Sequence, residues 1–140
     1  MLAKVHSFVL IGIEATLCEV EADVAQRGLS RTVMVGLPQA AVKESIERVQ
    51  RAMINSGFPF PAHAIAINLA PADVKKEATS LDLPMAIGLL RGTNSIASET
   101  HKQFLIAGEL ALDGRVRKIR GALSMALLAR QKGYRGVILP

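Results

Sequence analysis

The sequence of 140 residues contains one cysteine, no tryptophan, four phenylalanines and one tyrosine. A single cysteine excludes an internal disulfide, which is typical of a protein kept in the reducing cytoplasm. Cys18 alternates with Val20, Ala22 and Val24, and this period of two predicts a thiol buried on one face of a strand. The few, scattered aromatic residues exclude a platform on which nucleic-acid bases stack.

Membrane-spanning runs and phosphate-binding loops are also missing. Half of the residues are hydrophobic, yet no apolar run approaches the roughly 18 residues that a membrane span needs. The first residues, MLAKVHSFVLIG, include Lys4 and His6 and no small-residue cleavage site, so they predict a strand and not a signal peptide. Neither G-x-x-x-x-G-K-[ST] nor G-x-G-x-x-G occurs, so these residues carry no phosphate loop of either kind.

Metal-ligand spacing is absent as well. His6, His63 and His101 occur singly, without the paired spacing of zinc ligands. Glu19, Glu21 and Asp23 share one face of a predicted strand at successive spacings of about 6.5–7 Å, which is wide for one divalent ion. We therefore expect a solvated strand face there and no metal site.

Positive charge is concentrated near the carboxyl terminus. The chain has 17 Lys and Arg against 12 Asp and Glu. Residues 1–113 contain ten bases and twelve acids, a net charge of −2, whereas residues 114–140 contain seven bases and no acid. These bases are Arg115, Arg117, Lys118, Arg120, Arg130, Lys132 and Arg135. Such a cluster either binds phosphates, faces a neighbouring domain or subunit, or is simply solvated.

Hydrophobic spacing predicts an α/β fold, in the form of an α+β sandwich with a mixed sheet. Alternation predicts strands at 4–11, 16–24, 32–35, 64–69 and 136–139, with a hairpin over 104–118. Helices are expected from Pro38 to Gly57, at 81–90, and at 122–132 before Gly133. The buried stripe of the first helix is expected at Val42, Ile46, Val49 and Met53, and its exposed pairs at Glu44–Arg48 and Glu47–Arg51. The predicted order is βββαβαββαβ.

The segment Gly108–Gly121, GELALDGRVRKIRG, predicts a hairpin that leads into a helix. Asp113 and Gly114 suit the central positions of a type I′ turn, where both residues have positive φ. The strand after this turn is expected to place Arg115, Arg117 and Arg120 on one side and Lys118 on the other. On the helix, the expected inward positions are Leu123, Ala126 and Leu127, and Arg130 is expected on the polar side.

Three separated motifs resemble the amino-terminal domain of the ComM/YifB family, which are Mg-chelatase-like proteins of bacteria. They are MVGLPQAAVKESIERV at 34–49, NLAPADVKKEATSLDLPMA at 68–86, and GELALDGRVRKIRG at 108–121. The resemblance covers essentially the whole chain and implies that an AAA+ ATPase module, with its ATP and Mg site, follows residue 140. It also implies a cytoplasmic, ring-shaped homo-oligomer that handles DNA, including branch migration of recombination intermediates during natural transformation. The chain itself is then expected to bind no cofactor.

The same fold resembles the proteolytic domain of Lon-type proteases and the second domain of a small-subunit ribosomal protein. The Lon comparison places Ser80 at the nucleophile position and Leu123 where Lon carries its lysine base. Leucine accepts no proton, so we expect no catalytic residue. Members of the ComM/YifB family usually have Gly-Pro before this serine. This chain has Ala78-Thr79 instead, which predicts a different loop shape. A serine without a base is expected to cap the following helix, with Thr79 and Asp82 as a looser capping box.

Three functions are open on the sequence alone. They are an accessory domain of a DNA-processing ATPase, a Lon-type peptidase that uses Ser80, and a structural or regulatory spacer domain. The candidate DNA- or partner-binding residues are Arg115, Arg117, Lys118, Arg120, Lys75 and Lys76. Lys75 and Lys76 belong to the charged loop 70–80 between a strand and a helix, where binding loops commonly lie. No membrane contact is expected.

Overall fold

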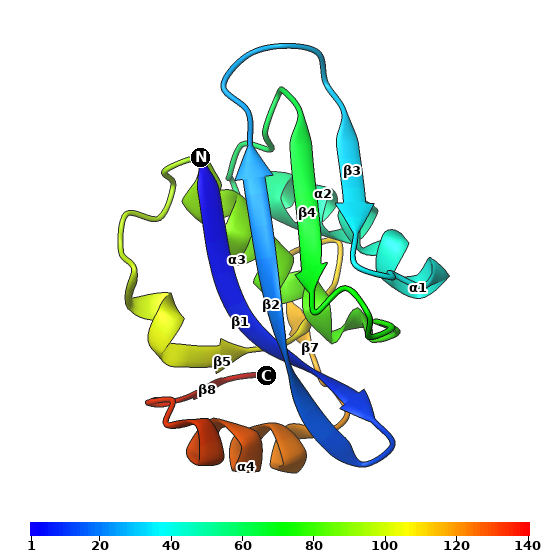
Figure 1. The fold of residues 1–140 in the computed structure, drawn as a ribbon. Helices are drawn as coiled ribbons and strands as arrows, with labels where there is room; N and C mark the ends of the chain where they lie inside the picture. The colour runs from blue at the N-terminus through cyan, green and yellow to red at the C-terminus, as the bar shows by residue number, and fades with distance from the viewer.

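A four-stranded mixed sheet organises the computed structural model, which describes residues 1–140 (Figure 1). β1 (Leu2–Ile11) and β2 (Glu14–Val24) form a long antiparallel ribbon, and β2 pairs on its other side with β4 (Ile65–Ala70). β3 (Thr32–Val35) runs parallel to β4, which gives the order β1-β2-β4-β3. The alternation of apolar residues sets the register, so that Val5 lies opposite Val20 and Ala22 opposite Ile67.

Helices α2 (Ser45–Asn55) and α3 (Asp82–Gly92) cover one face of this sheet (Figure 1). A core of 20 buried residues lies between the helices and the sheet, and it includes Val5, Val20, Val49, Leu69 and Leu89. Cys18 belongs to this core with 1 % of its surface exposed, as its alternation predicted. A buried free cysteine packs as a small apolar side chain.

The carboxyl-terminal residues cover part of the opposite face of the β1–β2 ribbon. β5 (Phe104–Ile106) and β8 (Gly136–Ile138) form a parallel pair, and α4 (Ala122–Lys132) lies beside them (Figure 1). β1 therefore presents Val9 to the main core and the adjacent Phe8 to a second core with Leu105, Met125 and Leu128. The ribbon is buried on both faces at this point.

The predicted hairpin over 104–118 is wrong in its first strand. β5 pairs with β8, and the hairpin is confined to β6 (Glu109–Leu110) and β7 (Val116–Arg117). Its loop spans Leu112–Gly114: the Gly114 N–H donates to the Ala111 carbonyl at 3.0 Å, and the Ala111 N–H donates to the Arg115 carbonyl at 2.9 Å. Only Gly114 in this loop has positive φ (91°), so the turn is a type I turn with a left-handed glycine and not the predicted two-residue type I′ turn.

The helix predicted from Pro38 is divided in two. α1 (Ala40–Lys43) begins after Pro38, which instead forms a bridge with Lys76, and α2 follows from Ser45. The expected stripe is inside the protein: Val42, Val49 and Met53 are buried, and Ile46 packs against the core. The expected surface pair with Glu44 is wrong because Arg48 turns inward to the buried carboxylate of Asp82. The pair of Glu47 and Arg51 forms no ion pair either.

The faces of α4 differ from the prediction, although its bounds and the glycine after it agree. Leu123 and Leu127 are 74 % and 56 % exposed, and Ala126 is exposed as well. The buried positions are instead Met125, Leu128 and Ala129. Because α4 carries apolar residues around most of its circumference, spacing alone does not select the face that packs.

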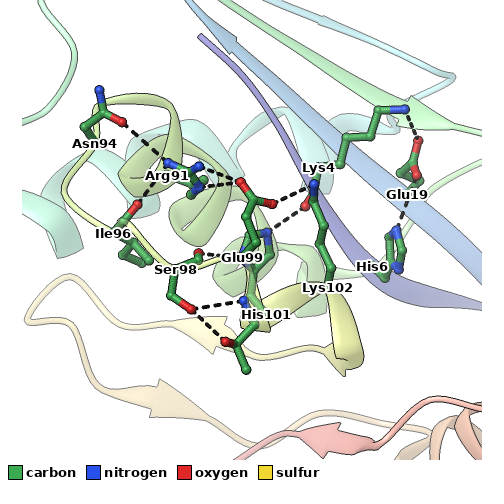
Figure 2. A network of polar contacts seen from close by, with 11 residues as sticks. Lys4, His6, Glu19, Arg91, Asn94, Ile96, Ser98, Glu99, His101 and Lys102 are labelled. Carbon is green, nitrogen blue, oxygen red and sulfur yellow. Dashed lines mark hydrogen bonds and ion pairs between the residues drawn. The ribbon is translucent and has the colours of Figure 1, made fainter.

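The carboxylates of β2 form a polar strand face, as predicted, but basic residues of neighbouring strands pair with them. Figure 2 shows Lys4 and His6 of β1 on either side of Glu19. Lys4 Nζ lies 3.4 Å from Glu19 and 3.7 Å from Glu21, and His6 Nε2 lies 3.4 Å from Glu19. Asn68 donates a 2.8 Å hydrogen bond to Glu21. No group of three or more His, Cys, Asp or Glu side chains is arranged to hold a metal ion.

Candidate functional site

A pocket of about 570 Å³ lies where β1, the segment 77–80 before α3, β6 and the segment after β7 meet. Its walls combine apolar residues of β1 with charged and hydroxyl side chains from the other three segments. The polar residues that line it are Glu77, Thr79, Ser80, Glu109, Lys118 and Arg120. This groove contains the serine that the Lon comparison singled out.

Backbone hydrogen bonds hold the serine in place. Ser80 lies in the short 3₁₀ helix η1 (Thr79–Leu81), which leads directly into α3, and it is 6 % exposed. Its carbonyl accepts the Gly108 N–H at 2.9 Å, and the Gly108 carbonyl accepts the Leu83 N–H at 3.0 Å. These two bonds attach the segment between β5 and β6 to the first turn of α3.

The Ser80 hydroxyl does not cap a helix, so that prediction is wrong. The N-cap positions fall at Ala78 for η1 and Leu81 for α3, and neither helix has a side-chain capping hydrogen bond. The looser capping box is wrong too, since Thr79 Oγ1 donates to Glu109 Oε2 at 2.6 Å and Asp82 accepts from Arg48. The η1 turn places Ser80 inside a helical segment, two residues past the N-cap Ala78 and one residue before Leu81, the N-cap of α3.

The Ser80 hydroxyl has no hydrogen-bonded side-chain partner. A nucleophilic serine needs a proton acceptor within about 2.6–3.2 Å of its oxygen. Ser80 Oγ forms no hydrogen bond with another protein side chain, and the nearest lysine in the sequence, Lys76, donates its Nζ hydrogen bond to the Pro71 carbonyl. Leu123, the residue at the Lon lysine position, is an exposed aliphatic side chain on α4. Glu77, Glu109 and Lys118 line the same pocket, and none of them forms a hydrogen bond with Ser80 Oγ.

Lys76 is fully buried, so the prediction that it binds DNA or a partner is wrong. Its backbone N–H donates to Leu37 at 3.1 Å and its carbonyl accepts from Gln39 at 2.9 Å, which ties loop 70–80 to the segment before α1. Burial lowers the pKa of Lys76, and it raises the pKa of Cys18 to about 11. Lys75 is exposed and is still a candidate.

Four exposed bases form what we call the basic ridge: Arg115, Arg117, Lys118 and Arg120. Only Arg115 has a carboxylate partner, since its Nε lies 2.8 Å from Asp113. Lys118 and Arg120 both line the 570 Å³ pocket, so the expectation that they lie on opposite sides is wrong. Residues 119–121 leave strand geometry after β7, which breaks the alternation that the prediction assumed.

Sequence reasoning missed the contribution of Glu77 and Glu109 to the pocket, and it missed the inward turn of Arg48. Arg48 Nε and Nη2 donate to the Asp82 carboxylate at 2.7 and 3.1 Å, and the Leu110 N–H donates to it at 3.1 Å. An acidic residue between Leu81 and Leu83, in a helix that is otherwise almost wholly apolar, was the available signal of a buried partner.

The chain belongs to the family described as subunit ChlI of Mg-chelatase, whose family model matches residues 20–140. Among its relatives is YifB of Escherichia coli, which is 41 % identical over 137 residues, covering 98 % of this chain and 27 % of that protein. The competence protein ComM of Haemophilus influenzae is 41 % identical over 138 residues, covering 99 % of this chain and 27 % of that protein. The chain thus spans about a quarter of the length of these relatives.

A Lon protease of Chloroflexus aurantiacus is 30 % identical over 131 residues, which cover 94 % of this chain and 16 % of that protein. These comparisons confirm the resemblance to the ComM/YifB family that the three motifs predicted, and they support the mixed α/β fold class. The likeness to a ribosomal protein domain stays a prediction. No helix is both long enough and apolar enough to cross a membrane.

Proposed function

We propose that this chain is the non-catalytic amino-terminal domain of a larger, cytoplasmic Mg-chelatase-like ATPase of the ComM/YifB type. In this proposal an AAA+ module follows residue 140, binds ATP and Mg, and assembles into a ring. The whole protein then processes DNA, including branch migration during recombination and natural transformation. The domain contributes a DNA-facing surface, the basic ridge. The Ser80 pocket beside this ridge has no catalytic activity in this proposal.

The observation that carries the proposal is the unneutralised charge of the basic ridge. Arg117, Lys118 and Arg120 are exposed and have no carboxylate within ion-pair distance, in contrast to Lys4, Arg48 and Arg91, which are all paired. Exposed guanidinium and ammonium groups that lack partners gain affinity for phosphates by releasing condensed counterions, without reading sequence. The ridge is therefore a suitable surface for a DNA backbone.

The test is the salt dependence of DNA binding by the chain, measured by fluorescence anisotropy with single-stranded and branched DNA. For each phosphate neutralised, the log–log slope should be about −0.7 to −0.9. Arg117→Ala with Arg120→Ala should make the slope shallower by about 1.4–1.8. Lys43→Ala with Arg51→Ala removes the same charge from exposed positions of α1 and α2 and should leave the slope unchanged. Equal effects of the two double variants would contradict a ridge-specific contact.

Lon-type peptidase activity is the second candidate, because a Lon protease is among the relatives and Ser80 occupies the nucleophile position. The missing base argues against it, and we expect no hydrolysis of an unfolded casein substrate. If hydrolysis is observed and Ser80→Ala abolishes it, the peptidase proposal replaces the one made here. A domain that neither cleaves casein nor retains DNA at low salt would instead be the structural spacer.

A further inference from the structure

A second pocket, of about 480 Å³, lies at the opposite end of α4 from the basic ridge. It forms where β1, the turn before β5 and the end of α4 meet, and it shares no lining residue with the serine groove. Among its lining residues are His6, Lys102, Gln103, Lys132, Tyr134 and Arg135. α4 has 11 residues, so the two sites lie about 16 Å apart along its axis.

The pocket is cationic and polar. Lys102, Lys132 and Arg135 line it, and no carboxylate does. Lys102 is partly neutralised, because its Nζ lies 2.6 Å from Glu99, and Figure 2 shows that Glu99 is shared with Arg91. Lys132 forms no ion pair. The only side-chain partner of Arg135 is the Gln103 amide oxygen at 3.4 Å, a long hydrogen bond.

A hydrogen-bonded pair, Tyr134 and His6, also lines the pocket. The Tyr134 hydroxyl lies 2.8 Å from His6 Nδ1, and the two rings meet edge to face with centroids 5.5 Å apart. Burial raises the pKa of Tyr134, so the phenol keeps its proton and adds no negative charge to the pocket. His6 Nε2 faces Glu19, which lies on β2, outside the pocket lining.

Three features near the pocket repel an anion: the carboxyl end of α4, and the carboxylates of Glu19 and Glu99, which pair with His6 and Lys102. A helix carries about half a negative charge at this end. Glu99 is paired with Lys102, whereas Lys132 and Arg135 have no carboxylate partner, so two full positive charges face the half charge of the helix end. A single cation would be enough to compensate the charge of the helix end. The pocket has three cations, and two of them, Lys102 and Arg135, lie outside α4.

We propose that this pocket binds a phosphate group, and that Lys132 and Arg135 hold it with charge-assisted hydrogen bonds. Lysine and arginine are the side chains that recognise phosphate oxygens, arginine through a planar fork and lysine through a compact charge. The phosphate can come from a nucleic-acid backbone or from a small phosphate ester. The proposal does not rest on DNA binding by the basic ridge, since the residues are different.

The experiment follows the backbone amides of the chain by two-dimensional ¹H–¹⁵N NMR during titration with sodium phosphate, with sodium chloride holding the ionic strength constant. Saturable shifts should occur at Gln103, Lys132, Tyr134 and Arg135. A parallel titration with an octathymidylate distinguishes the sources. If the oligonucleotide shifts the same amides and phosphate displaces it, the ligand is a backbone phosphate; if only inorganic phosphate acts, the ligand is a small phosphate. Both results support the site.

Lys132→Ala with Arg135→Ala should weaken phosphate binding about tenfold or more, since each charge-assisted contact contributes appreciably to affinity. Lys43→Ala with Arg51→Ala is the charge-matched control and should change the affinity by less than about twofold. Absence of saturable shifts at these amides in the unmodified chain would overturn the proposal, and so would equal weakening by both double variants. If the basic ridge does not bind DNA, this would be seen separately, in the salt dependence of DNA binding by the Arg117→Ala, Arg120→Ala variant.

Discussion

Removing the Asp82 carboxylate is the most informative perturbation of the framework around the groove. This side chain is fully buried and accepts three hydrogen bonds, two from Arg48 and one from the Leu110 backbone. Asp82 thereby joins α3, on which it lies, to α2 and to the β6–β7 hairpin. In Asp82→Ala the Arg48 guanidinium loses its carboxylate partner and keeps only its hydrogen bonds to Ser45 and Ala41, and the Leu110 N–H is left unsatisfied.

The magnitude follows from these contacts. Breaking a buried ion pair by removing one partner costs about 3–5 kcal/mol. An unsatisfied buried N–H adds about 1–3 kcal/mol. The side chain of Arg48 is 22 % exposed, so water recovers part of its lost interaction. We expect a net loss of about 3–4 kcal/mol, which is a large part of the roughly 5–15 kcal/mol that stabilises a domain.

The assay is urea unfolding followed by circular dichroism. With an m-value of about 2 kcal/mol/M, the midpoint should fall by roughly 1.5–2 M. Asp113→Ala, which removes an exposed ion-pair partner of Arg115, is the matched control and should leave the midpoint unchanged. Arg48→Met combined with Asp82→Leu should recover much of the loss, because it removes both charges. A loss below about 1 kcal/mol for Asp82→Ala would refute the reasoning.

Three further predictions concern Gly108, which is hydrogen-bonded to the start of α3, and Cys18 in the main core. In Gly108→Ala the new Cβ would lie 2.4 Å from Val116 Cγ1 and 3.3 Å from Leu83 Cδ2. The free energy of unfolding, measured by thermal unfolding, should therefore fall by about 1–3 kcal/mol. An unchanged melting temperature would contradict this close packing around Gly108. Cys18 should resist a disulfide reagent at pH 8 until the chain is unfolded, and rapid reaction of the native chain would contradict its burial. Because burial raises the pKa of Cys18 from 9.0 to about 11, the native state retains the proton, and stability present below pH 9 should fall between pH 9 and 11.

Strong periodicity made several elements predictable. Cys18, Val20, Ala22 and Val24 alternate strictly, and all four are buried on β2 as that pattern requires. The third predicted helix also has the observed bounds, because a glycine stands at each end of α4. In both cases the local sequence contains the whole signal.

Long-range pairing explains most of the errors. β5 was assigned to the wrong partner because β8, more than 30 residues away, offers it a parallel edge that no local pattern marks. Arg48 was placed on the surface because its partner Asp82 is 34 residues away. These choices depend on which elements become neighbours in the folded chain, and the hydrophobic period of one element does not contain that information.

For the Ser80 pocket, the sequence predicted the serine and did not predict the residues around it. The Lon resemblance located Ser80, but the residues that share its pocket, Glu77 and Glu109, come from loop and strand positions with no motif of their own. Sequence also did not separate Lys75 from Lys76. One is exposed and the other fully buried, because the bridge with Pro38 fixes which side chain turns inward.

The most direct test of the claim that Ser80 is not an activated nucleophile is covalent labelling of the chain with a fluorophosphonate, followed by intact-mass and peptide mass spectrometry. Fluorophosphonates react with serines whose hydroxyl is activated by a neighbouring base. Since no side chain forms a hydrogen bond with Ser80 Oγ, we predict no phosphonyl adduct on the peptide that contains it, even when the reagent is in excess. A stoichiometric adduct at Ser80, absent after unfolding, would contradict the proposal that this domain acts by binding alone.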